Sequence, residues 1–152
     1  MSHVRKQVRD AVGVLLSANP TNWNHVFKTK ITPQREVLPY LLVYIDNENI
    51  EALDISPAYL QLRDMQLIVR GRFRLVEGES LEDYLDDIAV EIETKLTTAT
   101  LKAQLADKLK GFELVTINDD LITDDNERSY AEIVFEWHVK VMTTEGIPET
   151  LA

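Results

Sequence analysis

The sequence predicts an α+β fold, with a mainly antiparallel or mixed sheet of about five strands and helices packed on one face. Three observations predict it. Apolar residues recur at helical spacing near the N-terminus and after residue 80, segments 59–76 and 129–142 alternate apolar with polar residues, and short connections join successive strands. Short connections favour antiparallel pairing, so the expected order of elements is α-β-β-β-α-α-β-β.

The first half of the chain is expected to hold one helix followed by three strands. The helix covers residues 3–17, where valine recurs at every fourth position along one face. A short alternating segment at 25–31 and a nearly continuous apolar run at 37–45 predict two strands, the second buried on both faces. An acidic loop at 46–58 then leads to a long strand at 59–76.

Two helices are expected next. Ser80 can cap the first of them, because Asp83 stands three residues later, in an aspartate variant of the capping box. The second covers residues 100–110, where leucines stand one turn apart, and it ends in lysines followed by Gly111, a typical stop signal.

The last third of the chain is expected to complete the sheet. Segment 112–117 predicts a strand, 118–127 an acidic loop, and 129–142 a strand with a clear apolar face. We expect residues 1–142 to form a single domain and residues 143–152 to be a flexible C-terminal tail.

The charge balance argues against general attraction to nucleic acid. Sixteen lysines and arginines stand against 26 acids, giving a formal charge of −10, whereas proteins that grip DNA concentrate positive charge. The chain has no cysteine, no apolar run of the roughly 20 residues that span a bilayer, and no recognisable secretory signal. These features predict a protein made and used in a reducing cytoplasm.

The sequence offers no clear catalytic or metal-binding set. Its histidines, His3, His25 and His138, fall in three different predicted elements, and the usual zinc, nucleophile-elbow and phosphate-loop motifs are absent. The acidic loops lack the glycine of an EF-hand, and their acids are accounted for by solvation. We therefore expect a protein that is not an enzyme and that has no cofactor or metal.

Three arginines at alternate positions are the most unusual feature. Arg70, Arg72 and Arg74 share one face of the predicted strand 59–76, and Glu132 and Glu136 lie on the polar face of the last strand. The row could be solvated surface, a weak nucleic-acid site, or one half of a complementary protein surface answered by the two glutamates.

The order of these blocks resembles a known family. A basic amphipathic helix ("VRKQVRDAVGVLL") leads to "VFKTKI", then "LPYLLVYIDNENIE", "LQLRDMQLIVRGRF", the acidic "LEDYLDDIAVEIETKL", and a close in "FELVTIND…YAEIVFEWHVKV". Over residues 3–142 this is similar to the tail terminator family of long-tailed bacteriophages, the group that includes the lambda-type minor tail protein U.

The resemblance implies a structural virion protein without catalysis. Members form a hexameric ring on the head-proximal end of the tail tube, stop further addition of tube subunits, and present the surface that joins the filled head. The expected partners are copies of the chain itself, the tail tube protein and a head-completion or neck protein. DNA passes through the ring without specific binding, no membrane is involved, and the protein is in the host cytoplasm until it joins the virion.

Within that framework, charged residues receive expected roles. The arginine row would contact the next subunit or the tube, or pair with Glu132 and Glu136 inside the subunit. Acidic residues of the two loops would line the lumen or rim and repel DNA phosphates. These acids are Asp46, Glu48, Glu51, Asp119, Asp120, Asp124 and Asp125.

Two alternative functions stay open at this point. One is another phage neck component, such as a head-closure or tail-completion protein. The other is a cytoplasmic module that binds a metal or a small ligand through the acidic loops.

Overall fold

The computed structural model describes residues 2–32, 38–53, 59–75, 80–123 and 129–152. Over these residues the predicted α+β fold and the order of its first eight elements are confirmed, and a further strand follows. The elements are α1 (Val4–Ser17), β1 (His25–Phe27), β2 (Tyr40–Ala52), β3 (Leu60–Arg74), α2 (Leu81–Lys95), α3 (Thr98–Gln104), β4 (Leu109–Thr123), β5 (Ser129–Thr144) and β6 (Ile147–Leu151).

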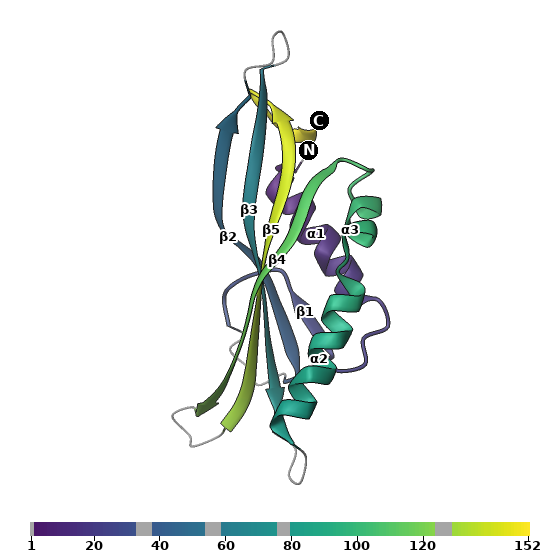
Figure 1. Ribbon diagram of the computed structural model, residues 1–152, viewed down its shortest axis with the longest axis vertical. Helices are drawn as coiled ribbons and strands as arrows, with labels where there is room; N and C mark the ends of the chain where they lie inside the picture. Colours follow the sequence, from purple (N-terminus) through teal and green to yellow (C-terminus); the bar gives the residue numbers. More distant parts are fainter. Residues whose placement is uncertain (1, 33–37, 54–58, 76–79, 124–128) are drawn as a thin grey trace.

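The sheet is mixed and strongly twisted (Figure 1). Its strand order is β1-β2-β3-β5-β4, in which β1 runs parallel to β2 and every other pair is antiparallel. The short β1 pairs only with Tyr40–Leu42, so the rest of β2 forms one edge of the sheet in the described part of the chain. At the opposite edge lies β4, which is paired with β5 alone among the described residues.

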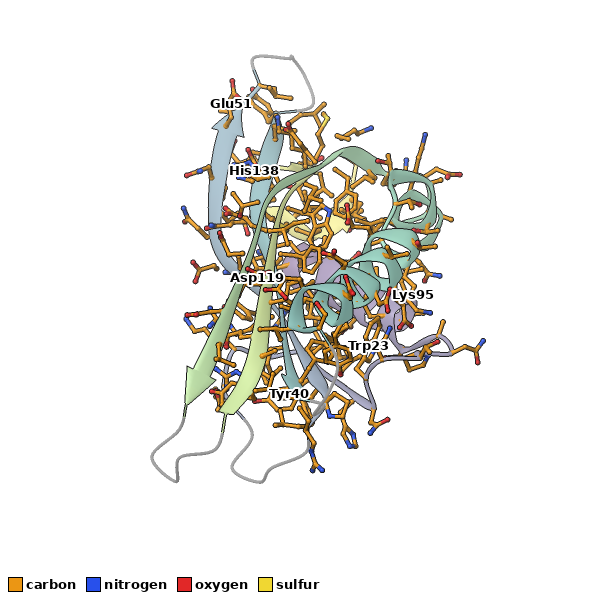
Figure 2. The ribbon with its side chains drawn as sticks, turned by 60° about the horizontal axis from the view of Figure 1, so that its bottom comes forward. Trp23, Tyr40, Glu51, Lys95, Asp119 and His138 are labelled. Atoms are coloured by element: carbon orange, nitrogen blue, oxygen red, sulfur yellow. The ribbon has the colours of Figure 1, made fainter. Side chains whose placement is uncertain are left out.

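The helices lie on one face of the sheet, as the sequence predicts (Figure 1). Alternate residues of β3 and β5 point toward them and are buried, including Met65, Phe73, Phe135 and Trp137. Between the helices and the sheet, Trp23 is buried and donates a hydrogen bond from Nε1 to the Leu16 carbonyl at 2.9 Å (Figure 2). No helix in the described ranges is long and apolar enough to span a membrane.

Gly71 lies at one core position of β3, where a side chain would not fit. A Cβ there would lie 2.5 Å from Cε2 of Phe73 and 2.9 Å from Cδ2 of Leu41. The Phe73 ring therefore fills the space that a larger residue at position 71 would need.

Several element boundaries differ from the sequence predictions. The two segments predicted as acidic loops are largely strand, since β2 continues through Asp46 to Ala52 and β4 through Asn118 to Thr123. Backbone pairing with β3 and β5 overrides their polar composition. The predicted strand 25–31 shortens to β1, and the predicted helix 100–110 ends at Gln104, because Ala106 and Asp107 take positive φ angles.

The segment 143–152 is not the loose tail that its composition predicts. Thr143 and Thr144 end β5, and β6 pairs with them. Because β4 starts opposite Val141, the end of β5 has a free edge that β6 occupies. The Ala152 amide donates to the Met142 carbonyl at 2.8 Å, and the Gln7 side chain of α1 donates to the Glu149 carbonyl at 2.7 Å.

Candidate functional site

Two of the three arginines of the row, Arg70 and Arg72, form ion pairs inside the subunit. Glu132 lies directly across from Arg72 in the pairing of β3 with β5. Its Oε1 accepts from Arg70 Nη1 and its Oε2 from Arg72 Nε, each at 2.9 Å, and its side chain is almost completely buried. Of the alternatives that the sequence left open for the row, Arg70 and Arg72 follow pairing with Glu132 inside the subunit.

Arg72 is the most enclosed member of the row. Its Nη1 also donates to the Tyr40 hydroxyl at 3.1 Å and to Thr32 Oγ1 at 3.3 Å, and its guanidinium lies 5.5 Å from the centroid of the Tyr130 ring. Burial alone would lower the pKa of Arg72, but the bonds to Glu132 and Tyr40 outweigh it and raise that pKa above its usual value. The cation is therefore held firmly in its charged form.

The other two residues predicted for this surface, Glu136 and Arg74, do not join the cluster of Arg70, Arg72 and Glu132. Glu136 lies opposite Ile68, where its carboxylate accepts from the Gln66 side chain and from Thr116 Oγ1, the latter at 3.3 Å. Arg74 is exposed at the end of β3. The structure therefore brings Glu132, but not Glu136, to the arginines.

Glu48, predicted to line a rim, is a structural acid instead. Its side chain is buried and accepts a hydrogen bond from Arg63, and Arg5 Nε lies 3.5 Å from its Oε2. Arg63 is buried too, and its Nε donates to Thr143 Oγ1 at 2.8 Å. Sequence reasoning missed this pair, although Arg63 stands two residues before Met65, on the core face of the strand.

The remaining predicted acids fall at opposite edges of the sheet. Asp46 and Glu51 are exposed on β2, and Asp119 and Asp120 are exposed on β4, so one subunit does not bring the two sets together. Figure 2 shows Glu51 and Asp119 on their two strands. Asp124 and Asp125 lie outside the described residues. A role for any of these acids in a lumen stays a prediction.

Much of the outer edge of β4 is exposed. Every residue from Val115 to Leu121, here called the β4 edge, is exposed. Three of them are large apolar residues that retain 43–51% of their accessible surface, namely Val115, Ile117 and Leu121. Since Ile117, Asp119 and Leu121 pair with core-facing residues of β5, they share one face, with the acid between the two apolar side chains.

A basic cleft lies at the other edge of the sheet. It has a volume of about 410 Å³ and lies between the first half of α1, residues 29–31 and the Tyr44–Ile45 part of β2. Its basic lining residues are His3, Arg5, Lys6, Arg9 and Lys30. Sequence reasoning recorded the basic face of the first helix but had no signal that a cleft forms beside it, because the cleft requires residues 29–31 to fold against that face.

Two titratable groups near this cleft have shifted pKa values. His3 caps α1, its Nδ1 accepting from the Arg5 amide at 3.1 Å. Burial, together with the positive charge of Arg5, lowers the pKa of His3 below its usual value. Hydrogen bonds from Lys6 and Lys28, at 2.8 and 2.9 Å, lower the pKa of Asp10.

Metal-ligating side chains do not gather in the described part of the chain, where no group of three or more His, Asp or Glu residues is placed to hold an ion. His138 lies 3.4 Å from an oxygen of Asp64 and 3.8 Å from one of Glu136.

Comparison with known proteins adds a distant structural likeness. No protein-family model matches the chain, and no curated protein matches it either. A chain of the "Virion of native gene transfer agent (GTA) particle" is similar in structure at 12% sequence identity and a TM-score of 0.41, with 91% of this chain and 92% of that chain covered. A likeness of this strength does not assign a function.

Proposed function

We propose that this chain is a structural protein of a phage-type virion that acts as a tail terminator. Six copies form a ring on the head-proximal end of the tail tube. The ring stops addition of tube subunits and presents a surface to a neck or head-completion protein, and DNA crosses its hole without specific binding. The chain catalyses no reaction in this role, and it waits in the host cytoplasm until it joins the virion.

The observation that carries the proposal is the β4 edge. The outer side of β4 pairs with no strand among the described residues, and it exposes three apolar side chains. Such an edge is a surface suited to contact with another protein. Its two exposed acids, Asp119 and Asp120, give that contact a defined charge. The β4 edge and the basic cleft are different patches at opposite edges of one sheet, which is the arrangement that a head-to-tail, ring-closing contact needs.

The sequence blocks supply the second support. Their resemblance to tail terminators implies an α+β domain, and the observed order of elements agrees with the order that those blocks predict. The net charge of −10 fits a subunit that stays apart from its copies until a tube presents a template, because like charges repel at long range.

The arginine row contributes less to this contact than its sequence suggests. Arg70 and Arg72 are engaged with Glu132, whereas Arg74 is exposed and available to a neighbour or to the tube. Arg74 is thus the arginine of the row that is most accessible to a partner.

The proposal is tested by assembly. Sedimentation velocity over rising concentration is expected to show a hexameric species. Electron microscopy of the protein added to tail tubes that lack a terminator is expected to show rings at one tube end. Rings at the head-proximal end of the tube support a terminator, and rings attached to the head portal instead support a head-closure protein. A chain that stays monomeric at high concentration and also on tubes would contradict the proposal.

A further inference from the structure

We infer that the basic cleft of one copy binds the β4 edge of the next copy, with Asp119 as the acid that enters it. This inference rests on the proposed function, and it names the two surfaces that meet in the ring. It makes the cleft a carboxylate site whose occupant is a second copy of this chain.

The cleft has more positive charge than its own acids neutralise. Lys6 is paired with Asp10, and Arg5 Nε lies 3.5 Å from Oε2 of Glu48, whose other carboxylate oxygen pairs with Arg63. Arg9 Nε is buried and has no hydrogen-bond partner among the described residues, and Lys30 has no ion pair there either. Arg9 and Lys30 therefore leave positive charge at the cleft, which would attract an incoming carboxylate.

The cleft also has apolar walls, which distinguishes it from a simple phosphate site. Ile31, Tyr44 and Ile45 line it beside the cations. The β4 edge has the matching pattern, because Asp119 is flanked on its own face by Ile117 and Leu121. A volume of about 410 Å³ is enough for a few side chains.

The position of the two surfaces allows the contact to repeat. The cleft lies at the free edge of β2, and β3 and β5 separate that strand from β4. Three strand spacings amount to about 14 Å, so one subunit cannot insert its own β4 edge into its own cleft. Each copy therefore offers an acid to one neighbour and a cleft to the other.

Disulfide trapping tests the contact directly, because the chain has no cysteine of its own. The Lys30→Cys, Asp119→Cys variant, oxidised under conditions where it sediments as an assembly, is expected to give a ladder of covalent species up to hexamer. An equal mixture of the two single variants is expected to stop at dimers. The matched control is Lys102→Cys with Asp119→Cys, since Lys102 is exposed on α3 and does not line the cleft.

A charge-reversal experiment is the second test of the contact. Lys30→Glu is expected to raise the concentration of half-assembly at least about tenfold, and adding Asp119→Lys in the same chain is expected to recover most of that loss. Lys102→Glu serves as the control for net charge. Circular dichroism melting is expected to show that each variant is folded, since Lys30 and Asp119 are both exposed.

The outcomes separate the two proposals. Hexamers that form normally while the Lys30–Asp119 variant cross-links no better than its control would overturn the cleft contact and leave the ring intact. A chain that never assembles would overturn both. Binding of a short DNA duplex by the unmodified chain that Lys30→Glu abolishes would assign the cleft to phosphates instead and overturn the inference.

Discussion

Glu132 holds two arginines at once, so its replacement tests the internal charge cluster most sharply. Glu132→Gln keeps the size of the side chain and removes the charge that Arg70 and Arg72 share. Removing one partner of a buried pair costs about 3–5 kcal/mol, because the other charge stays buried without compensation. Here the arginine side chains keep 32% and 16% exposure, and Arg72 retains its bond to Tyr40.

We therefore expect Glu132→Gln to lower the free energy of unfolding by about 2–3 kcal/mol, after allowing for that exposure. For a chain of this length the melting temperature would fall by roughly 4–12 °C. Urea unfolding followed by circular dichroism measures the loss, and an unchanged m-value shows that the unfolding transition is otherwise the same.

The matched control is Glu136→Gln, which lies on the same face of β5, four residues further along the strand. Glu136 accepts hydrogen bonds from the Gln66 and Thr116 side chains and forms no ion pair with any arginine that the structure describes, so its loss is expected to cost less than about 1 kcal/mol. The double variant Glu132→Leu, Arg72→Leu is expected to be milder than Glu132→Leu alone. If Glu132→Gln were no more destabilising than Glu136→Gln, the reasoning about the arginine row would be wrong.

Three further predictions concern packing and pH. Gly71→Ala is expected to destabilise the fold by about 1–3 kcal/mol, because its Cβ would lie 2.5 Å from the Phe73 ring. Gly111→Ala is the milder control in the same urea titration, because the nearest atoms to its Cβ belong to the flexible Lys140 side chain, at 3.3 Å or more. The lowered pKa of His3 means that the folded state resists protonation, so the free energy of unfolding is expected to fall as pH drops below 6.5. His3→Asn supplies a cap that does not titrate, so the melting temperature should depend less on pH between pH 7.5 and 5.5. An unchanged dependence of the melting temperature on pH would count against this role of His3. The lowered pKa of Asp10 contributes stability above about pH 4 that is lost as pH falls through the folded-state pKa; Asp10→Asn should remove that part of the acid dependence, and identical acid unfolding curves would contradict it.

The periodicity of the sequence was sufficient to place side chains on faces. It put Arg70, Arg72 and Arg74 on the face opposite Met65 and Phe73, and that alternation of burial holds from residue 63 to residue 74 except at Ile68, which is buried too. It also located the capped start of α2, where Ser80 accepts from the Asp83 amide. Both are local properties of the chain, set by bond geometry within a few residues.

Composition misled where distant pairing decided the outcome. Segment 118–123 is acidic enough to predict a loop, yet it extends β4 because β5 lies beside it, and segment 147–151 becomes a strand because β5 outlasts β4. The same holds for the candidate site. The basic residues of α1 were visible in the sequence, whereas the cleft needed residues 29–31 to fold against them.

The sequence by itself determined the fold class, the two faces of each long strand and the excess of negative charge. Tertiary structure decided which charges meet: Glu132 with two arginines, and Glu48 with Arg63. It also gathered basic residues at the β2 edge, two of which, Arg9 and Lys30, have no ion pair among the described residues. The reason is that a side chain's face follows from the strand's own period of two residues, whereas its partner depends on strand order and register, which join residues far apart in the chain.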